Sequence, residues 1–306
     1  MKQIAQHQGK LLINEPMSRH TSWRVGGCAD RFYVPTDLTD LQGFLAHLPQ
    51  DEAVYFVGLG SNLLVRDGGI RGTVILMHNA LTELKMEGDL VYAEAGVTCA
   101  KLAKFCAKES KFGAEFFAGI PGTVGGALAM NAGCYGSETW NVVRRVTTIG
   151  KQGELTTRDA SAFVPTYRHI EKPVADEWFV AAWLILANGD VNESSQKIKT
   201  LLAKRLASQP LNLPSAGSTF RNPDGDFAAR LIEASGLKGY IIGGAQVSEK
   251  HANFIVNVGN ATALDIELLI KHIRETVLEK HGVTLQQEVK VIGELGARDW
   301  ELGARK

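Results

Sequence analysis

Residues 120–136 read IPGTVGGALAMNAGCYG, and this stretch decides between the possible folds. It holds five glycines, three alanines and one proline, and it contains no charged side chain. One interpretation is structural, because glycine supplies positive φ angles in loops and lets helices pack closely. The other is that small residues allow the main chain to approach a large, flat, phosphorylated ligand. The rest of the sequence distinguishes the two.

Composition limits the classes of protein to be considered. The chain has 306 residues, 45% hydrophobic and 22% charged, which is typical of globular proteins and sufficient for two or three domains. Lys plus Arg and Asp plus Glu number 33 each, so net charge favours neither nucleic acid nor an anionic membrane as a partner. We find no signal peptide and no apolar run of bilayer length. We therefore expect a cytoplasmic protein.

The cysteines predict neither a disulfide framework nor a metal site. There are four, and none forms a CxxC pair: Cys28, Cys99, Cys106 and Cys134. Cys99 and Cys106 lie seven apart in a helical pattern, which is typical of small buried side chains.

Strand and helix patterns alternate along the chain. Runs rich in Val, Ile, Tyr and Phe predict strands at 53–60, 72–77, 90–96, 142–150 and 177–189. Helical spacing predicts helices at 36–48 behind a threonine cap, at 98–110 capped by Thr98, and at 192–208 before Pro210. After a composition change near residue 205 we expect helices at 226–239 and 262–282 and strands at 251–259 and 283–294. The related copies ELGARDW and ELGARK, at 294–300 and 301–306, indicate a short helical or frayed end.

Two glycine-rich segments are candidates for binding phosphate. The first is VGLGSNLLVRDGG at 57–69, in which Leu63 occupies the third glycine position of the dinucleotide fingerprint GxGxxG, so a Rossmann site is excluded. A turn around Gly58 and Gly60 can still direct NH groups at a phosphate, although a simple hairpin turn fits equally well. In the second, residues 119–132, Thr123 is a plausible N-cap and an anion would meet the free NH groups of the following helix. Two such elements favour a cofactor that contains a pyrophosphate.

Six motifs occur in an order that resembles one enzyme family. They are TSWRVGG at 21–27, GLGSNLLVRDGG at 58–69, AGIPGTVGGALAMNAGCYG at 118–136, Tyr167-Arg168, AGSTFRNP at 216–223 and EVK at 288–290. Together they resemble the UDP-N-acetylenolpyruvoylglucosamine reductases, from about residue 14 to residue 294. The resemblance implies an α+β protein in which a two-subdomain FAD-binding fold of the vanillyl-alcohol-oxidase/PCMH type precedes a small α/β substrate-binding domain. It divides the chain into FAD-binding subdomains at 1–79 (rejoined by 290–306) and 80–204, and a substrate-binding domain at 205–289.

The resemblance implies a reaction and three catalytic residues. A hydride passes from NADPH through non-covalently bound FAD to the terminal carbon of an enolpyruvyl group, and the neighbouring carbon is protonated. Because charge builds up on the adjoining carboxylate, the site needs both a cation and a proton donor. By position, Ser218 matches the proton donor, Arg168 the residue that stabilises the enolate, and Glu288 the acid that assists protonation or polarises the substrate carboxylate. Without the resemblance they would be interpreted as a loop serine, a surface arginine and a solvated glutamate.

The resemblance also implies two sets of binding residues and no metal. The set expected to contact FAD comprises Gly58, Gly60, Ser61, Asn62, Leu63, Gly119, Ile120, Pro121, Gly122, Thr123, Gly125, Gly126, Ala127, Asn131 and Gly133. The set expected to contact the UDP-sugar comprises Tyr135, Tyr167, Gln209, Arg221, Asn222 and His251. In the family the nicotinamide and the UDP-sugar use one pocket in turn, which explains why no second dinucleotide motif appears. The family is mostly monomeric, so we expect a monomer.

The chain departs from part of the family. Only nine residues, 169–177, separate Arg168 from the next strand, so the chain resembles the shorter second type, which lacks a tyrosine-bearing segment that folds over the substrate. Ile170 stands where a serine commonly follows the Tyr-Arg pair, which predicts a weaker hydrogen-bond scaffold for Arg168.

Two other functions stay open. An oxidase of the same superfamily would lack the elements around Ser218 and Glu288. A nucleotide-binding protein without activity would keep the glycine loops and lose the catalytic residues. The presence of all three catalytic candidates favours the reductase.

Overall fold

The chain folds into two compact units, each built from segments that are far apart in the sequence. The computed structural model describes residues 8–296. Within that range, unit 1 comprises residues 8–12, 31–59 and 72–205, and unit 2 comprises 13–30, 60–71 and 206–296. Each is described by itself below.

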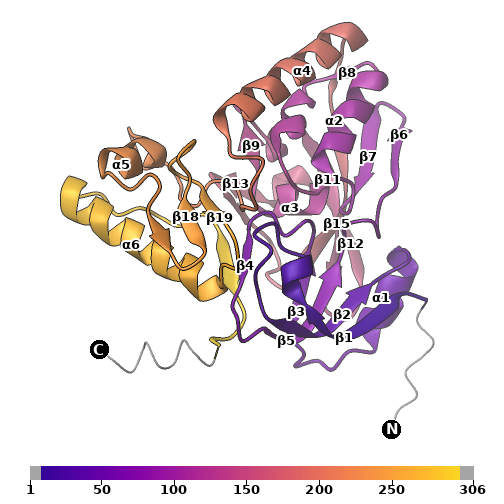
Figure 1. The fold of residues 1–306 in the computed structure, drawn as a ribbon. Coiled ribbons are helices and arrows are strands. Elements are labelled where there is room, and N and C mark those ends of the chain that lie inside the picture. The colour runs from indigo at the N-terminus through magenta and orange to yellow at the C-terminus, as the bar shows by residue number, and fades with distance from the viewer. Residues whose placement is uncertain (1–7, 297–306) are drawn as a thin grey trace. The chain divides into compact units, whose positions relative to one another are not determined.

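A five-stranded antiparallel sheet forms the centre of unit 1 (Figure 1). Its order is β12 (Leu155–Asp159), β11 (Val143–Gly150), β15 (Glu177–Ile185), β7 (Leu90–Glu94) and β6 (Leu84–Glu87). The helices α2 (Cys99–Lys108) and α3 (Val124–Ala129) share one hydrophobic core with this sheet. Cys99 and Cys106 are buried in that core, and burial raises the pKa of both thiols.

A second sheet in the first half of the chain has four strands. Its order is β1 (Lys10–Pro16), β2 (Cys28–Val34), β5 (Ile70–Leu76) and β3 (Val54–Val57), with β3 and β5 parallel. The helix α1 (Leu38–Ala46) belongs to unit 1 and begins after Asp37, whose carboxylate accepts from the NH of Asp40 at 2.8 Å. The predicted threonine cap is therefore wrong by one residue. Aspartate caps a helix at least as well as threonine does, and it follows the threonine directly.

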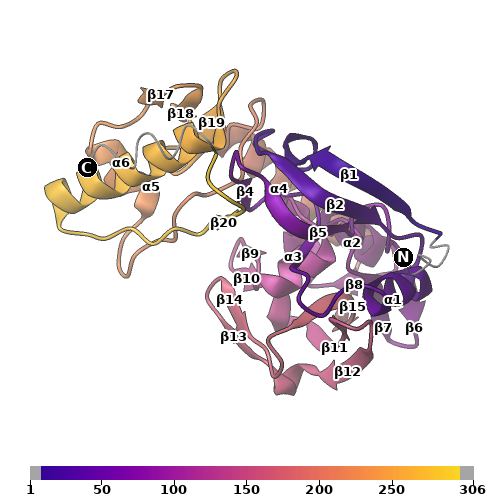
Figure 2. The same cartoon turned by 90° about the horizontal axis from the view of Figure 1, so that it is seen from below.

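Short strand pairs and one long helix complete unit 1. The pairs are β9 (Gly133–Cys134) with β10 (Ser137–Glu138), β13 (Val164–Thr166) with β14 (His169–Glu171), and β8 (Lys111–Phe112) with β16 (Ala187–Asn188). The helix α4 (Val191–Ser208) ends before Pro210, as predicted. Figure 2 shows β13 and β14 as a hairpin beside β9 and β10.

Unit 2 packs two helices against a small sheet (Figure 1). The strands β17 (Ile241–Ile242), β18 (Ala245–Val247) and β19 (Ile255–Asn257) form an antiparallel sheet, and the helices are α5 (Ala228–Ala234) and α6 (Ala263–His281). A separate parallel pair joins β4 (Leu63–Val65) to β20 (Lys290–Ile292). The core of this unit includes Trp23 and Leu64, so residues 13–30 and 60–71 contribute to it as well as the C-terminal segment.

Most predicted elements are present, and three are much shorter than predicted. The strand expected at 251–259 covers only β19, and the helix expected at 226–239 covers only α5. The pattern at 283–294 forms a strand only at β20, because residues 286–288 bond instead to residues 219–221. The interpretation of the first glycine-rich segment as a simple hairpin turn is wrong. The strands on either side of it do not pair with each other, because β3 pairs with β5 and β4 pairs with β20. The copy 301–306 at the end of the chain lies outside the described residues. None of the helices in residues 8–296 has the length and apolar character needed to cross a bilayer.

Candidate active site

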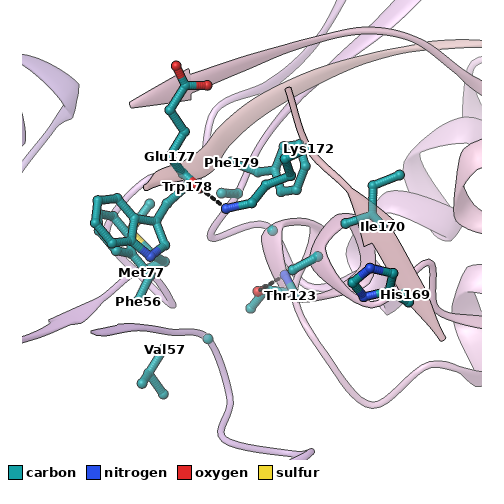
Figure 3. Close-up of a pocket in the computed structure, with 15 residues that line it drawn as sticks. Phe56, Val57, Met77, Thr123, His169, Ile170, Lys172, Glu177, Trp178 and Phe179 are labelled. Atoms are coloured by element: carbon teal, nitrogen blue, oxygen red, sulfur yellow. Dashed lines mark hydrogen bonds between the residues drawn. The ribbon is translucent and has the colours of Figure 1, made fainter. Parts of the chain in front are cut away.

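A pocket in unit 1 adjoins the glycine-rich stretch (Figure 3). Its volume is about 300 Å³. Small residues form one wall, aromatic and aliphatic side chains form another, and Lys172 is its basic residue. The lining residues are Phe56, Val57, Gly58, Met77, Ala95, Thr123, Gly125, Gly126, Ala129, His169, Ile170, Lys172, Glu177, Trp178 and Phe179. An apolar cavity with a few polar groups is the usual form of a cofactor or ligand site, and this volume fits part of a dinucleotide.

The two glycine-rich segments meet at this pocket. A Cβ on Gly58 would lie 2.5 Å from the Thr123 hydroxyl, so only glycine permits β3 to end against the start of α3. A Cβ on Gly125 would lie 2.8 Å from the Cβ of Ala95, which makes that glycine a packing requirement. Gly126 differs, since its nearest neighbour would be 3.8 Å away and its surface is exposed. The stretch therefore serves close packing and also leaves an open glycine at the pocket wall.

The N-terminus of α3 does not offer free NH groups. Thr123 caps it as predicted, accepting from the NH of Gly126 at 3.5 Å. The NH groups of Val124 and Gly125 donate to the carbonyls of Val97 and Ala95 at 2.8 and 2.9 Å. The expectation that these NH groups would meet an anion is wrong, because they attach the six-residue helix to the neighbouring segment.

Lys172 and His169 line the pocket but were not predicted from the sequence. The Lys172 amine donates to the carbonyls of Ala175 and Glu177, and burial lowers its pKa. Figure 3 shows this amine reaching toward the backbone of Glu177, whose carboxylate points away. Both residues fall in the segment 169–177, which the sequence marks only as a short connection and which carries no motif.

Arg168 lies at the tip of the β13–β14 hairpin. Thr166 pairs with His169, so Tyr167 and Arg168 make the two-residue turn. Arg168 has φ +57°, a left-handed conformation that costs a non-glycine residue roughly 1–2 kcal/mol. Its guanidinium donates to the carbonyl of Gly133 at 3.0 Å and lies 5.2 Å from the centre of the Tyr167 ring. Strain of this kind concentrates at functional sites.

Asn131 ties the hairpin to the glycine-rich stretch. Its side chain is buried, and its amide nitrogen donates to the Thr166 carbonyl at 3.1 Å and to the Glu138 carboxylate at 2.9 Å. Its amide oxygen accepts from the NH of Trp140 at 3.2 Å. Ile170 is a buried residue of the hydrophobic core, and the weaker hydrogen-bond scaffold expected for Arg168 stays a prediction.

Tyr135, the next-to-last residue of the stretch, has a left-handed conformation, with φ +55°. Its hydroxyl donates to the Leu201 carbonyl at 2.9 Å, while 44% of its surface is exposed. A Cβ on Gly119 would lie 2.6 Å from the Tyr135 ring, so Gly119 is small because this ring packs on it. Tyr167 is also exposed, at 45%.

In unit 2, Ser218 lies in an irregular segment between two isolated bridges, Ser215 with Val256 and Phe220 with Gln287. The NH of Thr219 donates to the Asn253 carbonyl at 2.8 Å. Gly217, at φ +73°, takes a left-handed conformation that favours glycine, directly before Ser218.

Glu288 lies on the other side of the same segment. Its NH donates at 2.8 Å to the carbonyl of Thr219, the residue after Ser218, so Glu288 and Thr219 are in direct contact. The Glu288 carbonyl accepts from the side chain of Asn62 at 3.3 Å, and Lys290 NH donates to the Asn62 carbonyl at 3.0 Å. Three of the predicted motifs therefore meet within unit 2.

The remaining predicted residues are spread around this segment. The Asn222 side chain accepts from the NH of Ala228 at 3.1 Å, and the NH of Arg221 donates to the Gln286 carbonyl at 2.8 Å. His251 packs edge-on against Phe254, and burial lowers the pKa of its imidazole. Gln209 follows α4 and is partly buried.

The structure groups the predicted residues by unit. Arg168, Tyr135, Tyr167, Gly58 and the residues from Gly119 to Gly133 belong to unit 1. Unit 2 holds the catalytic candidates Ser218 and Glu288, together with Gly60, Ser61, Asn62, Leu63, Gln209, Arg221, Asn222 and His251. Within residues 8–296, no three His, Cys, Asp or Glu side chains are grouped as a metal site would need.

Comparison with known proteins gives consistent results over most of the chain. A model of the C-terminal domain of UDP-N-acetylenolpyruvoylglucosamine reductase matches residues 209–292, and an FAD-binding domain model matches residues 29–158. The reductase of Thiobacillus denitrificans is 56% identical, over 94% of this chain and 93% of its own. That of Methylococcus capsulatus is also 56% identical, over 96% of each.

A solved structure agrees with these sequence relatives. The crystal structure of the reductase from Thermus caldophilus has a TM-score of 0.79 at 29% identity, covering 93% of this chain and 98% of its own. The predicted fold class is confirmed, with a PCMH-type FAD-binding domain followed by the C-terminal reductase domain. The chain belongs to the UDP-N-acetylenolpyruvoylglucosamine reductase family, the FAD-dependent oxidoreductases of peptidoglycan precursor synthesis.

Proposed function

We propose that this protein reduces the enolpyruvyl group of UDP-N-acetylglucosamine enolpyruvate to give UDP-N-acetylmuramate, with NADPH as the hydride donor, as a cytoplasmic monomer. The observation that supports the proposal is a backbone bond in unit 2, where the Glu288 NH donates to the carbonyl of Thr219, the residue after Ser218, at 2.8 Å. A hydroxyl and a carboxyl group on neighbouring segments suit the protonation of a carbon atom.

The residues available for FAD fit such a cofactor. Gly58, Thr123 and Gly126 line an apolar pocket with an open glycine wall, and Lys172 adds a basic group. We assign the remainder of the cofactor site to the predicted glycines, Ser61, Asn62 and their neighbours. When bound, FAD supplies hydride transfer between NADPH and the terminal carbon of the enolpyruvyl group.

Arg168 is proposed to bind the substrate carboxylate. Its planar guanidinium offers parallel NH donors that match the geometry of a carboxylate. As the double bond is reduced, charge accumulates on that carboxylate, and a fixed cation stabilises the charge without having to reorganise. The hairpin tip and the Gly133 carbonyl hold the guanidinium in place.

Ser218 is proposed to donate its proton to the carbon next to the one that receives the hydride. A serine hydroxyl is a weak acid, so a neighbouring group must support the transfer. Glu288 is the candidate for that support, because its backbone is bonded to the residue after Ser218. Tyr135, Tyr167, Gln209, Arg221, Asn222 and His251 are proposed to contact the UDP-sugar, and residues 205–289 to form the substrate-binding domain.

The two half-reactions, followed separately by rapid mixing, test the proposal. Ser218→Ala is expected to leave FAD reduction by NADPH intact and to slow reoxidation by the enolpyruvyl substrate about 10²–10⁴-fold, the usual contribution of a general acid. Ser215→Ala, in the same segment, is the matched control and is expected to change neither step. Equal loss in both half-reactions would refute the role of Ser218. Fast reoxidation by oxygen with no turnover of the enolpyruvyl substrate would favour the oxidase alternative.

A further inference from the structure

A buried asparagine, Asn253, forms hydrogen bonds with the segment that carries Ser218. The Asn253 side chain is 3% exposed, and it bonds to both backbone groups of Phe220. Its amide oxygen accepts from the Phe220 NH at 3.0 Å, and its amide nitrogen donates to the Phe220 carbonyl at 2.8 Å. Its own carbonyl accepts from the NH of Thr219 at 2.8 Å. One residue therefore bonds to the three peptide units that follow Ser218.

These bonds stand where regular strand pairing is absent. The segment contacts β19 through the isolated bridge of Ser215 with Val256, and Gly217 then takes φ +73° before Thr219. Asn253 lies in the turn that precedes β19. Its side chain offers a donor and an acceptor spaced like a peptide group, so it satisfies both backbone groups of Phe220.

Asn253 is itself held firmly. Its NH donates to Nδ1 of His251 at 3.3 Å, and the following Phe254 packs against the His251 ring. Burial lowers the pKa of His251, which favours the neutral imidazole that such an acceptor needs. On the other side of the segment, Glu288 NH bonds to the Thr219 carbonyl. The Ser218 segment is thus fixed from both sides.

We propose that Asn253 is a positioning residue that sets the location of the Ser218 hydroxyl for proton donation. The inference rests on the proposed role of Ser218. Asn253 acts through the backbone of Thr219 and Phe220, and it exchanges no proton with the substrate. A displacement of about 1 Å at a reacting group can cost about 100-fold in rate, so an effect on catalysis is expected even where folding survives.

Two variants of the FAD-loaded full chain test this role. Asn253→Ala removes both side-chain bonds and is expected to slow reoxidation by the enolpyruvyl substrate about 10–100-fold, while FAD reduction by NADPH stays within about twofold. Asn253→Asp keeps the acceptor for the Phe220 NH but places a carboxylate against the Phe220 carbonyl. A protonated aspartic acid restores the donor, so the reoxidation rate of this variant is expected to rise toward that of the unmodified protein as pH falls.

Controls separate positioning from general destabilisation. Asn257→Ala removes a comparable asparagine, whose side chain donates to the Trp23 carbonyl at 3.0 Å and accepts from Gly259 and Ala261. It is expected to lower the melting temperature without slowing reoxidation. Asn253 contacts His251, whose imidazole is affected by the charges of Lys238 and Glu233, and Glu288 bonds to the same segment at Thr219. Because these groups titrate in both proteins, the pH profile of the unmodified protein is the reference for the aspartate variant.

The outcomes are distinguishable. If Ser218→Ala slows reoxidation and both Asn253 variants react at the normal rate, the positioning role is wrong and the proposed function stands. If the Asn253 variants lose both half-reactions equally, or if Asn253→Asp shows no recovery at low pH, the residue is only structural. If Ser218→Ala itself has no effect on reoxidation, the proposed role of Ser218 is wrong, and the positioning role of Asn253, which rests on it, is wrong with it.

Discussion

At the scale of single residues, the glycine-rich stretch combines two roles that sequence alone does not separate. Gly119 and Gly125 are small because Tyr135 and Ala95 pack on them, whereas Gly126 leaves open space at the pocket. The role of Thr123 as the N-cap of α3 was predictable, because an N-cap side chain bonds to an NH group only a few residues away. The bonding of the first NH groups of α3 to Val97 and Ala95 was not, because it depends on segments that meet only in the fold.

Asn131→Asp tests whether the stretch holds Arg168 in place. The carboxylate would lose the donors to Thr166 and Glu138 and repel the Glu138 side chain. Disrupting buried bonds of this kind costs about 1–3 kcal/mol. We expect a lower melting temperature and reoxidation by substrate slowed about tenfold, in line with a misplaced Arg168.

The matched control for this variant is Asn141→Asp, at the exposed last residue of the 3-10 turn Thr139–Asn141. It is expected to change neither the melting temperature nor the rate of reoxidation by substrate. If Asn131→Asp instead weakens FAD binding and leaves the reoxidation rate of loaded enzyme unchanged, Asn131 contacts the cofactor, as the family resemblance implied.

At the scale of elements, most helices and strands were predictable because their apolar periodicity and caps are local. The exceptions are instructive. Residues 283–289 alternate like a strand, yet they bond to the Ser218 segment, and Leu285 and Val289 are buried in the core of unit 2. Asp67, in the first glycine-rich segment, accepts from the NH groups of Ala263 and Leu264 at 3.1 and 3.0 Å, which are the first two of α6 after its N-cap Thr262. No local pattern shows such long-range partners.

Glu177 links three adjacent strands of the large sheet and gives unit 1 a predictable response to acid. It lies on β15, accepts from Thr148 of β11 at 2.7 Å, and accepts from both terminal nitrogens of Arg158 on β12. The hydrogen bond from Arg158 is the main reason that its pKa lies below the ordinary value. Because the folded-state pKa is lower than the unfolded one, the stabilisation is complete above the unfolded pKa and is lost as pH falls through the folded pKa.

Glu177→Gln is expected to lower the free energy of unfolding by about 1.5–3 kcal/mol near neutral pH, the range for hydrogen bonds to charged groups. Denaturant titrations at a series of pH values measure this. The difference from the unmodified protein should shrink as pH falls through the lowered pKa of Glu177, because the native carboxyl then also becomes protonated. Asp159→Asn, which removes an exposed carboxylate on β12, is the control. A difference that stays constant down to acid pH would contradict the assignment.

At the scale of the whole molecule, unit 2 depends on residues from three separate parts of the chain. Trp23 is fully buried in its core, and its indole NH donates to the Ile255 carbonyl at 2.7 Å. The domain division predicted from the sequence, with 205–289 as one body, stays a prediction. The contribution of residues 13–30 to this core was invisible in the sequence, because a single tryptophan carries no information about its neighbours.

Trp23→Ala is expected to destabilise unit 2 by about 3–5 kcal/mol, as is usual for the loss of a large buried side chain. Hydrogen exchange read by mass spectrometry should show faster exchange in α5 and α6, while α2 in unit 1 keeps its protection. Phe179→Ala, in the core of unit 1, should show the reverse pattern. Equal loss in both regions after either substitution would mean that the units unfold as one.

The parallel pairing of β4 with β20 has a consequence for synthesis of the chain. From Val65 to Lys290 is 225 residues. At about 5–20 residues per second, β4 leaves the ribosome on the order of ten to fifty seconds before its partner exists. During that interval its edge is available to other strands, which is a known route to misassembly. A ribosome stalled before residue 290 should therefore carry a nascent chain in which unit 2 is still protease-sensitive, however long it waits.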